Sequence, residues 1–286
     1  MPTYPTKMNT SSHQVRSLSL PSKLNHINQQ IEHELKRLRI KEEASTSSSE
    51  SVIIGVSGLA ELYGCINRAL SLPMTQQALS LRQHEKHVGE LLKKCSSLLN
   101  VCNSIKEVLL QQGAITKEVE SALSHRKGES QNNIVNYNSS RKEVIRKSKD
   151  VLSSLNQLNA QVLGEDDCHS STVIKSLRCV SIINLSVYES LLSFLSMPVS
   201  KPKRSLVSKL MNKGKGKCER GNEIYDVDMV LHEMISGKTV DDAKLCFTVG
   251  KLKVLMGVME GMENGLESMY KELSETKVFL MNILSF

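Results

Sequence analysis

Few residues in this sequence have the types and spacing that catalysis or metal binding requires. His84 and His87 would lie one turn apart on a helix and could share a metal ion, but no carboxylate or cysteine joins them at ligand spacing. Glu85 and His87 come nearest to the Glu-x-x-His pattern of helical metal sites, and their spacing is wrong. We therefore expect two solvated histidines and no metal site.

Other catalytic patterns also fail. Residues Ser236 to Thr239 resemble the end of a phosphate-binding loop, but His232 stands where the first glycine belongs and no predicted strand precedes it. The sequence contains no Gly-x-Ser-x-Gly nucleophile elbow and no cysteine beside a matched histidine. We predict no catalytic residues, no cofactor and no small-molecule substrate, and favour a protein that is not an enzyme.

A stronger signal lies near the N-terminus, in a segment without helical periodicity. Arg16 stands three residues before Ser19, Pro21 stands two after it, and Ser17 lies between. This spacing resembles the phosphopeptides bound by 14-3-3 proteins, in which the phosphate pairs with an arginine cluster. It predicts a phospho-docking site with a 14-3-3 protein as candidate partner; the alternative is a segment that leads into a helix and is never modified.

A second segment is strongly basic. Eight of the 37 Lys and Arg residues and one of the 30 acidic residues lie between 197 and 222, so the rest of the chain is balanced in charge. Three interpretations stay open: a solvated linker, a nuclear import signal, or a patch for an anionic membrane. We do not expect nucleic acid as a partner. The candidate basic patch comprises Lys201, Lys203, Arg204, Lys209, Lys213, Lys215 and Lys217.

Composition and periodicity predict the elements that carry these segments. The 286 residues include no Trp, six Tyr and four Phe, too few aromatic residues for an ordinary β-sandwich or barrel. Apolar residues instead recur at helical spacing. Helices are predicted over 24–43, 52–72, 75–112, 115–126, 134–162, 173–195 and 224–235, with a last one from Thr239.

These predictions define an elongated antiparallel all-α bundle. We expect a disordered tail over 1–22, a bundle over 23–196, a basic flexible linker over 197–222 and C-terminal helices over 223–286 that pack on the bundle. Thr75 is expected to cap the long third helix and Gly113 to end it.

Three helices carry more specific expectations. The start of 134–162 is basic around Arg141, which indicates a solvated face or, as an alternative, an anion site. Residues 173–195 predict a central bundle helix, with a membrane span as the alternative. The four-residue spacing of Gly257, Gly261 and Gly265 predicts close helix packing in the last helix.

Cysteine usage and the N-terminus bear on location. Seven cysteines form no C-x-x-C pair and leave one over, which indicates a reducing compartment. The first 21 residues contain no apolar signal-peptide core. Because Glu32 is the first acidic residue and Ser and Thr precede it in number, a plastid transit peptide remains an alternative. We expect a cytoplasmic protein, with plastid and nucleus as alternatives.

Several short segments together resemble the BYPASS-like family of plant proteins, and the resemblance spans nearly the whole chain. Its most specific part is the motif Leu-x-Leu-Pro-x-Thr-Gln-Gln-Ala-Leu. The resemblance implies a predominantly helical plant protein connected with root and shoot development, and it implies no catalytic residues. The matching segments are the start at Arg16, residues 70–79, 98–102 and 140–142, and the closing Leu280-Met281-Asn282-Ile283-Leu284.

Together these features predict a non-enzymatic helical interaction protein acting in plant development, phospho-regulated through its N-terminal segment. One alternative is a membrane-associated protein that uses an apolar helix and basic flank over 178–220. A second is an enzyme of signal-metabolite synthesis whose site lies between helices.

Overall fold

The computed structural model of the protein describes residues 20–44, 48–125, 130–160, 171–197, 222–236 and 242–285. Every regular element in these ranges is a helix, which confirms the all-α class. The helices are α1 (Leu20–Ala44), α2 (Ser49–Leu70), α3 (Pro73–Leu79), α4 (Arg82–Ser124), α5 (Ser130–Ala160), α6 (Thr172–Leu195), α8 (Glu223–Ser236) and α9 (Asp242–Leu284).

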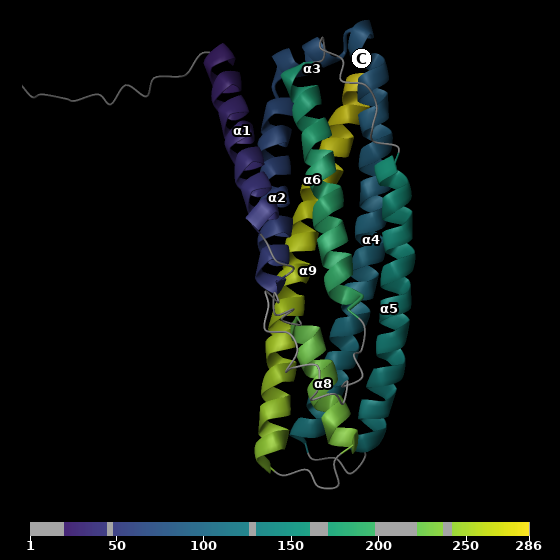
Figure 1. Ribbon diagram of the computed structural model, residues 1–286. Coiled ribbons are helices and arrows are strands. Elements are labelled where there is room, and N and C mark those ends of the chain that lie inside the picture. Colours follow the sequence, from purple (N-terminus) through teal and green to yellow (C-terminus); the bar gives the residue numbers. More distant parts are fainter. Residues whose placement is uncertain are drawn as a thin grey trace, which may run out of the picture.

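Two long helices form the axis of the bundle. α4 and α9 have 43 residues each, which corresponds to roughly 65 Å, and they pack against one another. α2 packs on the part of α9 nearer the C-terminus, α1 covers α2 from outside, and α5 lies along α4 (Figure 1). α6 contacts α2, α4 and α5 in the upper part of Figure 1, whereas α8 contacts α9 and α5 in the lower part.

One hydrophobic core joins these helices. Buried residues from all eight described helices belong to a single cluster, so α8 and α9 share a core with the preceding helices. Leu59, Tyr188 and Leu266 are completely buried at its centre. Burying apolar side chains on one continuous face of each helix is the main stabilising force of such a bundle.

The predicted start of the third helix at Thr75 and its predicted end at Gly113 are both wrong. Pro73 opens the short helix α3, so Thr75 lies in the first turn of α3 and does not cap α4. α4 begins at Arg82 and continues through Gly113 to Ser124. A glycine inside a helix costs about 1 kcal/mol relative to alanine, and burial of neighbours such as Leu109 and Thr116 outweighs that cost.

α6 lies inside the bundle, which fits the prediction of a central helix. α2 and α6 are each long and apolar enough to cross a membrane by length and composition alone. In the fold, however, Val180 and Leu191 of α6 are completely buried against neighbouring helices. The apolar composition of this helix is therefore explained by the bundle core.

The contact between α2 and α9 combines small residues with buried hydrogen bonds. A Cβ placed on Gly261 would lie 3.0 Å from Ile53 Cδ1, and one on Gly265 would lie 3.1 Å from Val56 Cγ1. Close packing is thus confirmed at two of the three predicted glycines. At Gly257 a Cβ would meet no neighbouring residue of the described chain within 4 Å, so the prediction is wrong there.

Candidate functional site

The predicted docking residues lie almost entirely outside the described residues. Arg16, Ser17 and Ser19 precede the first described position, while Pro21 lies in the first turn of α1. The whole basic patch, from Lys201 to Lys217, falls in the undescribed range 198–221. The structure does describe the residues on both flanks of that range, Met197 and Asn222, and both take part in a buried polar cluster.

The predicted histidine pair is placed differently from expectation. His84 is only 8% exposed, so it is not solvated. Nδ1 of His87 lies 3.0 Å from Nη2 of Arg178 on α6 and 3.9 Å from a carboxylate oxygen of Glu90. In the described ranges no group of three or more His, Cys, Asp or Glu side chains could hold a metal ion.

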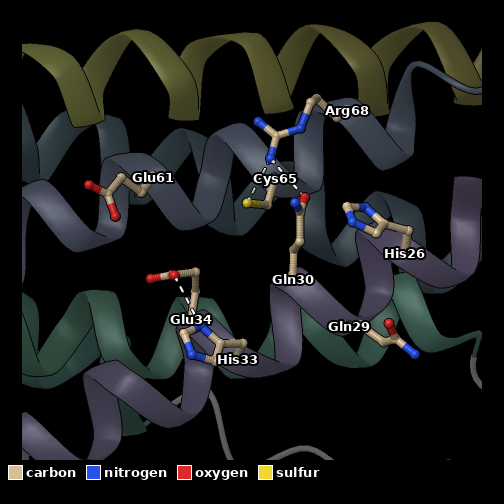
Figure 2. A pocket seen from close by; sticks show the side chains of 8 residues that line it. All are labelled: His26, Gln29, Gln30, His33, Glu34, Glu61, Cys65 and Arg68. Carbon is tan, nitrogen blue, oxygen red and sulfur yellow. Dashed lines mark hydrogen bonds and ion pairs between the residues drawn. The ribbon is translucent and has the colours of Figure 1, made fainter. Parts of the chain in front are cut away.

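One open groove lies between α1 and α2, with a volume of about 520 Å³ (Figure 2). Arg68 Nη2 donates to Gln30 Oε1 at 3.3 Å and lies 3.0 Å from Cys65 Sγ, so this guanidinium is held at the groove wall. His33 contacts its neighbour Glu34. The bond from Arg68 to Gln30 ties α1 to α2, and the described lining residues include no paired nucleophile and base. Its lining residues are His26, Gln29, Gln30, His33, Glu34, Glu61, Cys65 and Arg68.

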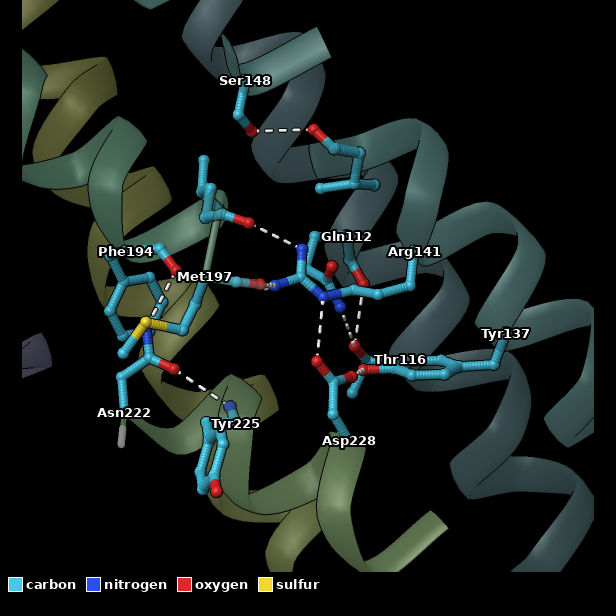
Figure 3. A network of polar contacts seen from close by, with 12 residues as sticks. Gln112, Thr116, Tyr137, Arg141, Ser148, Phe194, Met197, Asn222, Tyr225 and Asp228 are labelled. Atoms are coloured by element: carbon cyan, nitrogen blue, oxygen red, sulfur yellow. Dashed lines mark hydrogen bonds and ion pairs between the residues drawn. The ribbon is translucent and has the colours of Figure 1, made fainter. Parts of the chain in front are cut away.

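The most elaborate polar arrangement lies where α6 ends and α8 begins (Figure 3). Arg141 of α5 is completely buried at its centre. Its Nη1 donates to the carbonyl of Leu195 at 2.6 Å and its Nη2 to the carbonyl of Met197 at 2.8 Å. The last carbonyls of a helix have no partner within the helix, and a basic side chain satisfies them. Arg141 thus holds the C-terminal end of α6.

The same arginine also holds α8. Nε of Arg141 lies 3.3 Å from Oδ2 of Asp228, and the Tyr137 hydroxyl donates to Oδ1 of Asp228 at 2.9 Å. Burial raises the pKa of Asp228, while the charge of Arg141 and the hydrogen bond from Tyr137 oppose that shift. Burial and the nearby carboxylate raise the pKa of Tyr137 well above its ordinary value, so this phenol stays protonated and donates.

Asn222 closes the arrangement from the other flank of the basic segment. Its Nδ2 donates to the carbonyl of Phe194 at 2.8 Å, and its Oδ1 accepts from the backbone N–H of Tyr225 at 3.0 Å. The second bond is a helix N-cap, so one side chain both starts α8 and fastens it to the end of α6. We call Tyr137, Arg141, Asn222 and Asp228 the Arg141 cluster.

A further contact fixes the start of α8 from the side of α2. The Ser49 hydroxyl donates to Oε1 of Glu223 at 2.5 Å, joining the first turns of α2 and α8. Within α4, Gln112 Nε2 donates to Thr116 Oγ1 at 3.1 Å. Tyr137, Arg141, Asn222 and Asp228 each bond to protein groups and are buried, so this cluster positions the end of α6 against the start of α8.

The consequence concerns the basic segment. Met197 and Asn222 precede and follow residues 198–221. Arg141 donates to the Met197 carbonyl, and the Asn222 side chain donates to the Phe194 carbonyl, so both flanks are held at the end of α6. The two described residues that flank this 24-residue segment therefore lie at one junction of the bundle. The charge of this segment identifies it in the sequence, whereas the buried residues that anchor it were not predicted.

Arg141 itself corrects a prediction. It was expected on a solvated basic face, and it is completely buried. The expectation suits Arg146 on the same helix, which is exposed and pairs with Glu143 at 2.6 Å and Asp150 at 2.7 Å. A signal existed, because Arg141 follows Tyr137 by four residues and precedes Val144 by three, within the apolar stripe of α5.

The fold and its anchored insertion define an all-helical bundle protein in which a basic segment separates α6 from α8. The family model described as Protein BPS1 matches residues 55–283, so the chain belongs to the BYPASS family. No curated protein and no solved structure matched the chain in the corresponding comparisons.

Proposed function

We propose that this protein is a non-enzymatic helical interaction protein that acts in plant root and shoot development. In this proposal the bundle is a scaffold, and the N-terminal segment around Ser19 and the basic segment are its docking elements. The observation that carries it is the Arg141 cluster, which fixes both flanks of the basic segment to the bundle. A segment anchored at both ends is presented at a defined place, which lowers the entropy lost when a partner binds.

The proposed partners are proteins, with a 14-3-3 protein as the candidate for the phosphorylated N-terminal segment. Phosphate on Ser19 would add up to about two negative charges beside Arg16, in the pattern that such partners recognise. For the basic segment we propose an acidic protein surface, because clustered lysines steer an oppositely charged partner.

Affinity purification from plant tissue with mass spectrometry tests the proposal. Wild type is compared with Ser19→Ala and with a variant carrying Lys213→Gln, Lys215→Gln and Lys217→Gln. The matched control removes three exposed lysines from the bundle surface, through Lys86→Gln, Lys93→Gln and Lys149→Gln. We expect one set of partners to depend on Ser19 and another on the basic segment, with the control retaining both.

Two results would overturn the proposal. The first is a set of partners that all three variants retain equally. The second is conversion of a metabolite by the purified protein that is abolished by changing a carboxylate between helices, which would make the protein an enzyme.

A membrane-associated protein is the second candidate function. It draws on the apolar composition of α6, which passes the length and composition test for a span, and on the basic residues that follow it. The burial of α6 in the core weighs against a span. Carbonate extraction separates the two candidates, because a bundle protein is released into the supernatant and a spanning protein stays in the pellet.

A further inference from the structure

α9 carries an apolar stripe that no other helix covers in the part of the chain that the structure describes. Phe247 and Val254 are 58% and 56% exposed, unusually high for large apolar side chains. They alternate with Ala243, Gly250 and Gly257 at spacings of four and three, and all five are exposed. A Cβ on Gly250 or Gly257 would meet no neighbouring residue of the described chain within 4 Å. We call these five residues the α9 seam.

The seam continues an interface that the fold already uses. Immediately beyond it, Gly261 and Gly265 pack closely against Ile53 and Val56 of α2. α2 begins at Ser49 and covers the C-terminal part of α9. The seam precedes this covered part along α9. A strict four-three apolar spacing is the pattern that packs knobs into holes on another helix.

The neighbouring helices flank the seam without covering it. Lys251 binds Asp226 of α8 at 2.8 Å, and Lys253 lies 3.8 Å from Glu120 of α4. Lys251 also lies 5.8 Å from the centre of the Phe247 ring. Lys251 and Lys253 therefore have carboxylate partners within their own chain, which reduces their repulsion of another basic helix.

The large and small residues of the seam are so ordered that two antiparallel copies can place each large residue opposite a small one. If two copies of α9 lie antiparallel with a two-fold axis at Leu252, Phe247 of one copy faces Gly257 of the other and Val254 faces Gly250. Ala243 then comes level with Gly261, which packs against Ile53 near the start of α2. Each large side chain meets a position without one, as an isologous two-fold interface requires.

We propose that the α9 seam binds a second copy of this chain in an antiparallel two-fold dimer centred on Leu252. Residues 247–257 map onto themselves under this axis, so this stretch forms the centre of the interface, and beyond it the docked helix reaches the first residues of α2 in each copy. Phe247 and Val254 are the knobs of the interface, and Gly250 and Gly257 are the holes that receive them.

Analytical ultracentrifugation of the full chain tests the dimer. Wild type is expected to form a reversible dimer at about 100 μM, where even a micromolar association is populated. Phe247→Asp is expected to weaken it about 30-fold or more, as for a central interface residue. Val278→Asp is the matched control, because Val278 is 54% exposed on the same helix but lies outside the seam. Circular dichroism melts verify that both variants fold.

A size exchange tests the register. Phe247→Ala removes a knob and Gly257→Phe fills a hole, so each alone is expected to weaken the dimer. The double variant places the large residue at 257 against the small one at 247 of the other copy, and it is expected to restore association. A parallel dimer would bring two phenylalanines together at 257 and would not be rescued.

Three results would overturn the proposal. They are a monomer at all concentrations, a dimer insensitive to Phe247→Asp, and failure of the double variant to recover association. If wild type is monomeric but deletion of residues 203–218 produces a dimer that depends on Phe247, the seam is occupied by the chain's own segment around Leu206 and Leu210. That outcome also contradicts a dimer of the intact protein.

Discussion

α9 is fastened to its neighbours in two different ways along its length. Its C-terminal part packs on α2 through Gly261 and Gly265, and Asn67 of α2 reinforces the contact. The Asn67 amide donates to the Glu272 carbonyl at 2.9 Å and its oxygen accepts from Thr276 at 2.6 Å. Its N-terminal part packs on α8, whose attachment relies on the buried charges of Arg141 and Asp228.

The difference follows from the lengths of the two partner helices. α2 has 22 residues and contributes a long apolar face, so close contact and the hydrogen bonds of Asn67 suffice. α8 has 14 residues, near the length at which an isolated helix is marginal in water. A short helix at the end of a 24-residue insertion needs fixed ends, and the Arg141 cluster supplies them. The predictions below test this contrast.

The largest effect is expected from removing Arg141. Arg141→Ala leaves the buried Asp228 without its cation and the carbonyls of Leu195 and Met197 without a donor. Breaking a buried ion pair from one side costs about 3–5 kcal/mol of unfolding free energy, measured by urea denaturation. Hydrogen exchange should rise in α8 and the last turn of α6, while the α2–α9 contact stays protected.

The control for this prediction lies on the same helix. Arg146→Ala removes an exposed ion pair that solvent screens, and it should leave the urea midpoint unchanged. If Arg141→Ala raised exchange evenly along α2, α8 and α9, the two modes of attachment would not be independent.

Cysteines in the buried core should be alkylated more slowly than an exposed cysteine beside the seam. Burial raises the pKa of Cys95 to about 12 and that of Cys102 to about 11, whereas Cys246 is exposed beside the α9 seam. Because the thiolate reacts, a pKa near 12 lowers the reactive fraction at pH 8 about a thousandfold relative to a free thiol. Mass spectrometry of iodoacetamide-treated protein should show Cys246 modified long before Cys95 and Cys102.

The pH dependence of the same reaction has a defined sign. A raised thiol pKa delays formation of the thiolate, so modification of Cys95 should keep accelerating well above pH 9. Rapid labelling of Cys95 at pH 8 in folded protein would mean that α4 opens locally, against the packing described above.

The α2–α9 contact should respond to a single methyl group. Gly265→Ala places a Cβ 3.1 Å from Cγ1 and 3.3 Å from Cβ of Val56, a completely buried β-branched residue with little freedom to move. Overpacking typically lowers the free energy of unfolding by about 1–3 kcal/mol, and the better helix propensity of alanine offsets about 1 kcal/mol of this loss. We expect a lower thermal midpoint; an unchanged or higher one would show that α2 can shift away.

The sequence was sufficient for the class of fold and for most helices, because apolar periodicity depends only on local spacing. It was insufficient at Gly113, where tertiary packing outweighs a weak local preference and α4 continues. Charge alone did not distinguish Arg141 from Arg146, since both are basic residues of one helix. The place of Arg141 in the apolar stripe is a local signal for its burial, but its partner Asp228 lies 87 residues away.

In the site, too, some features could be predicted from local sequence and others depend on contacts between distant residues. Net charge identified the basic segment, but the residues that anchor it are a tyrosine and an arginine of α5 and an asparagine and an aspartate at the start of α8, two distant parts of the chain. The glycines show it most sharply. Gly257, Gly261 and Gly265 share one spacing, yet only the last two meet α2, because nothing local records where α2 begins.

The smallest predicted effect has the opposite sign to the others and comes from the third glycine. Gly257→Ala adds a Cβ that meets no neighbouring residue within 4 Å in the described chain, so it introduces no clash in the monomer. Alanine favours the helix over glycine by about 0.5–1 kcal/mol. At concentrations low enough for the monomer to dominate, the thermal midpoint should rise. A fall instead would mean that Gly257 is already packed against part of the same chain, and the contrast between the two parts of α9 would be lost.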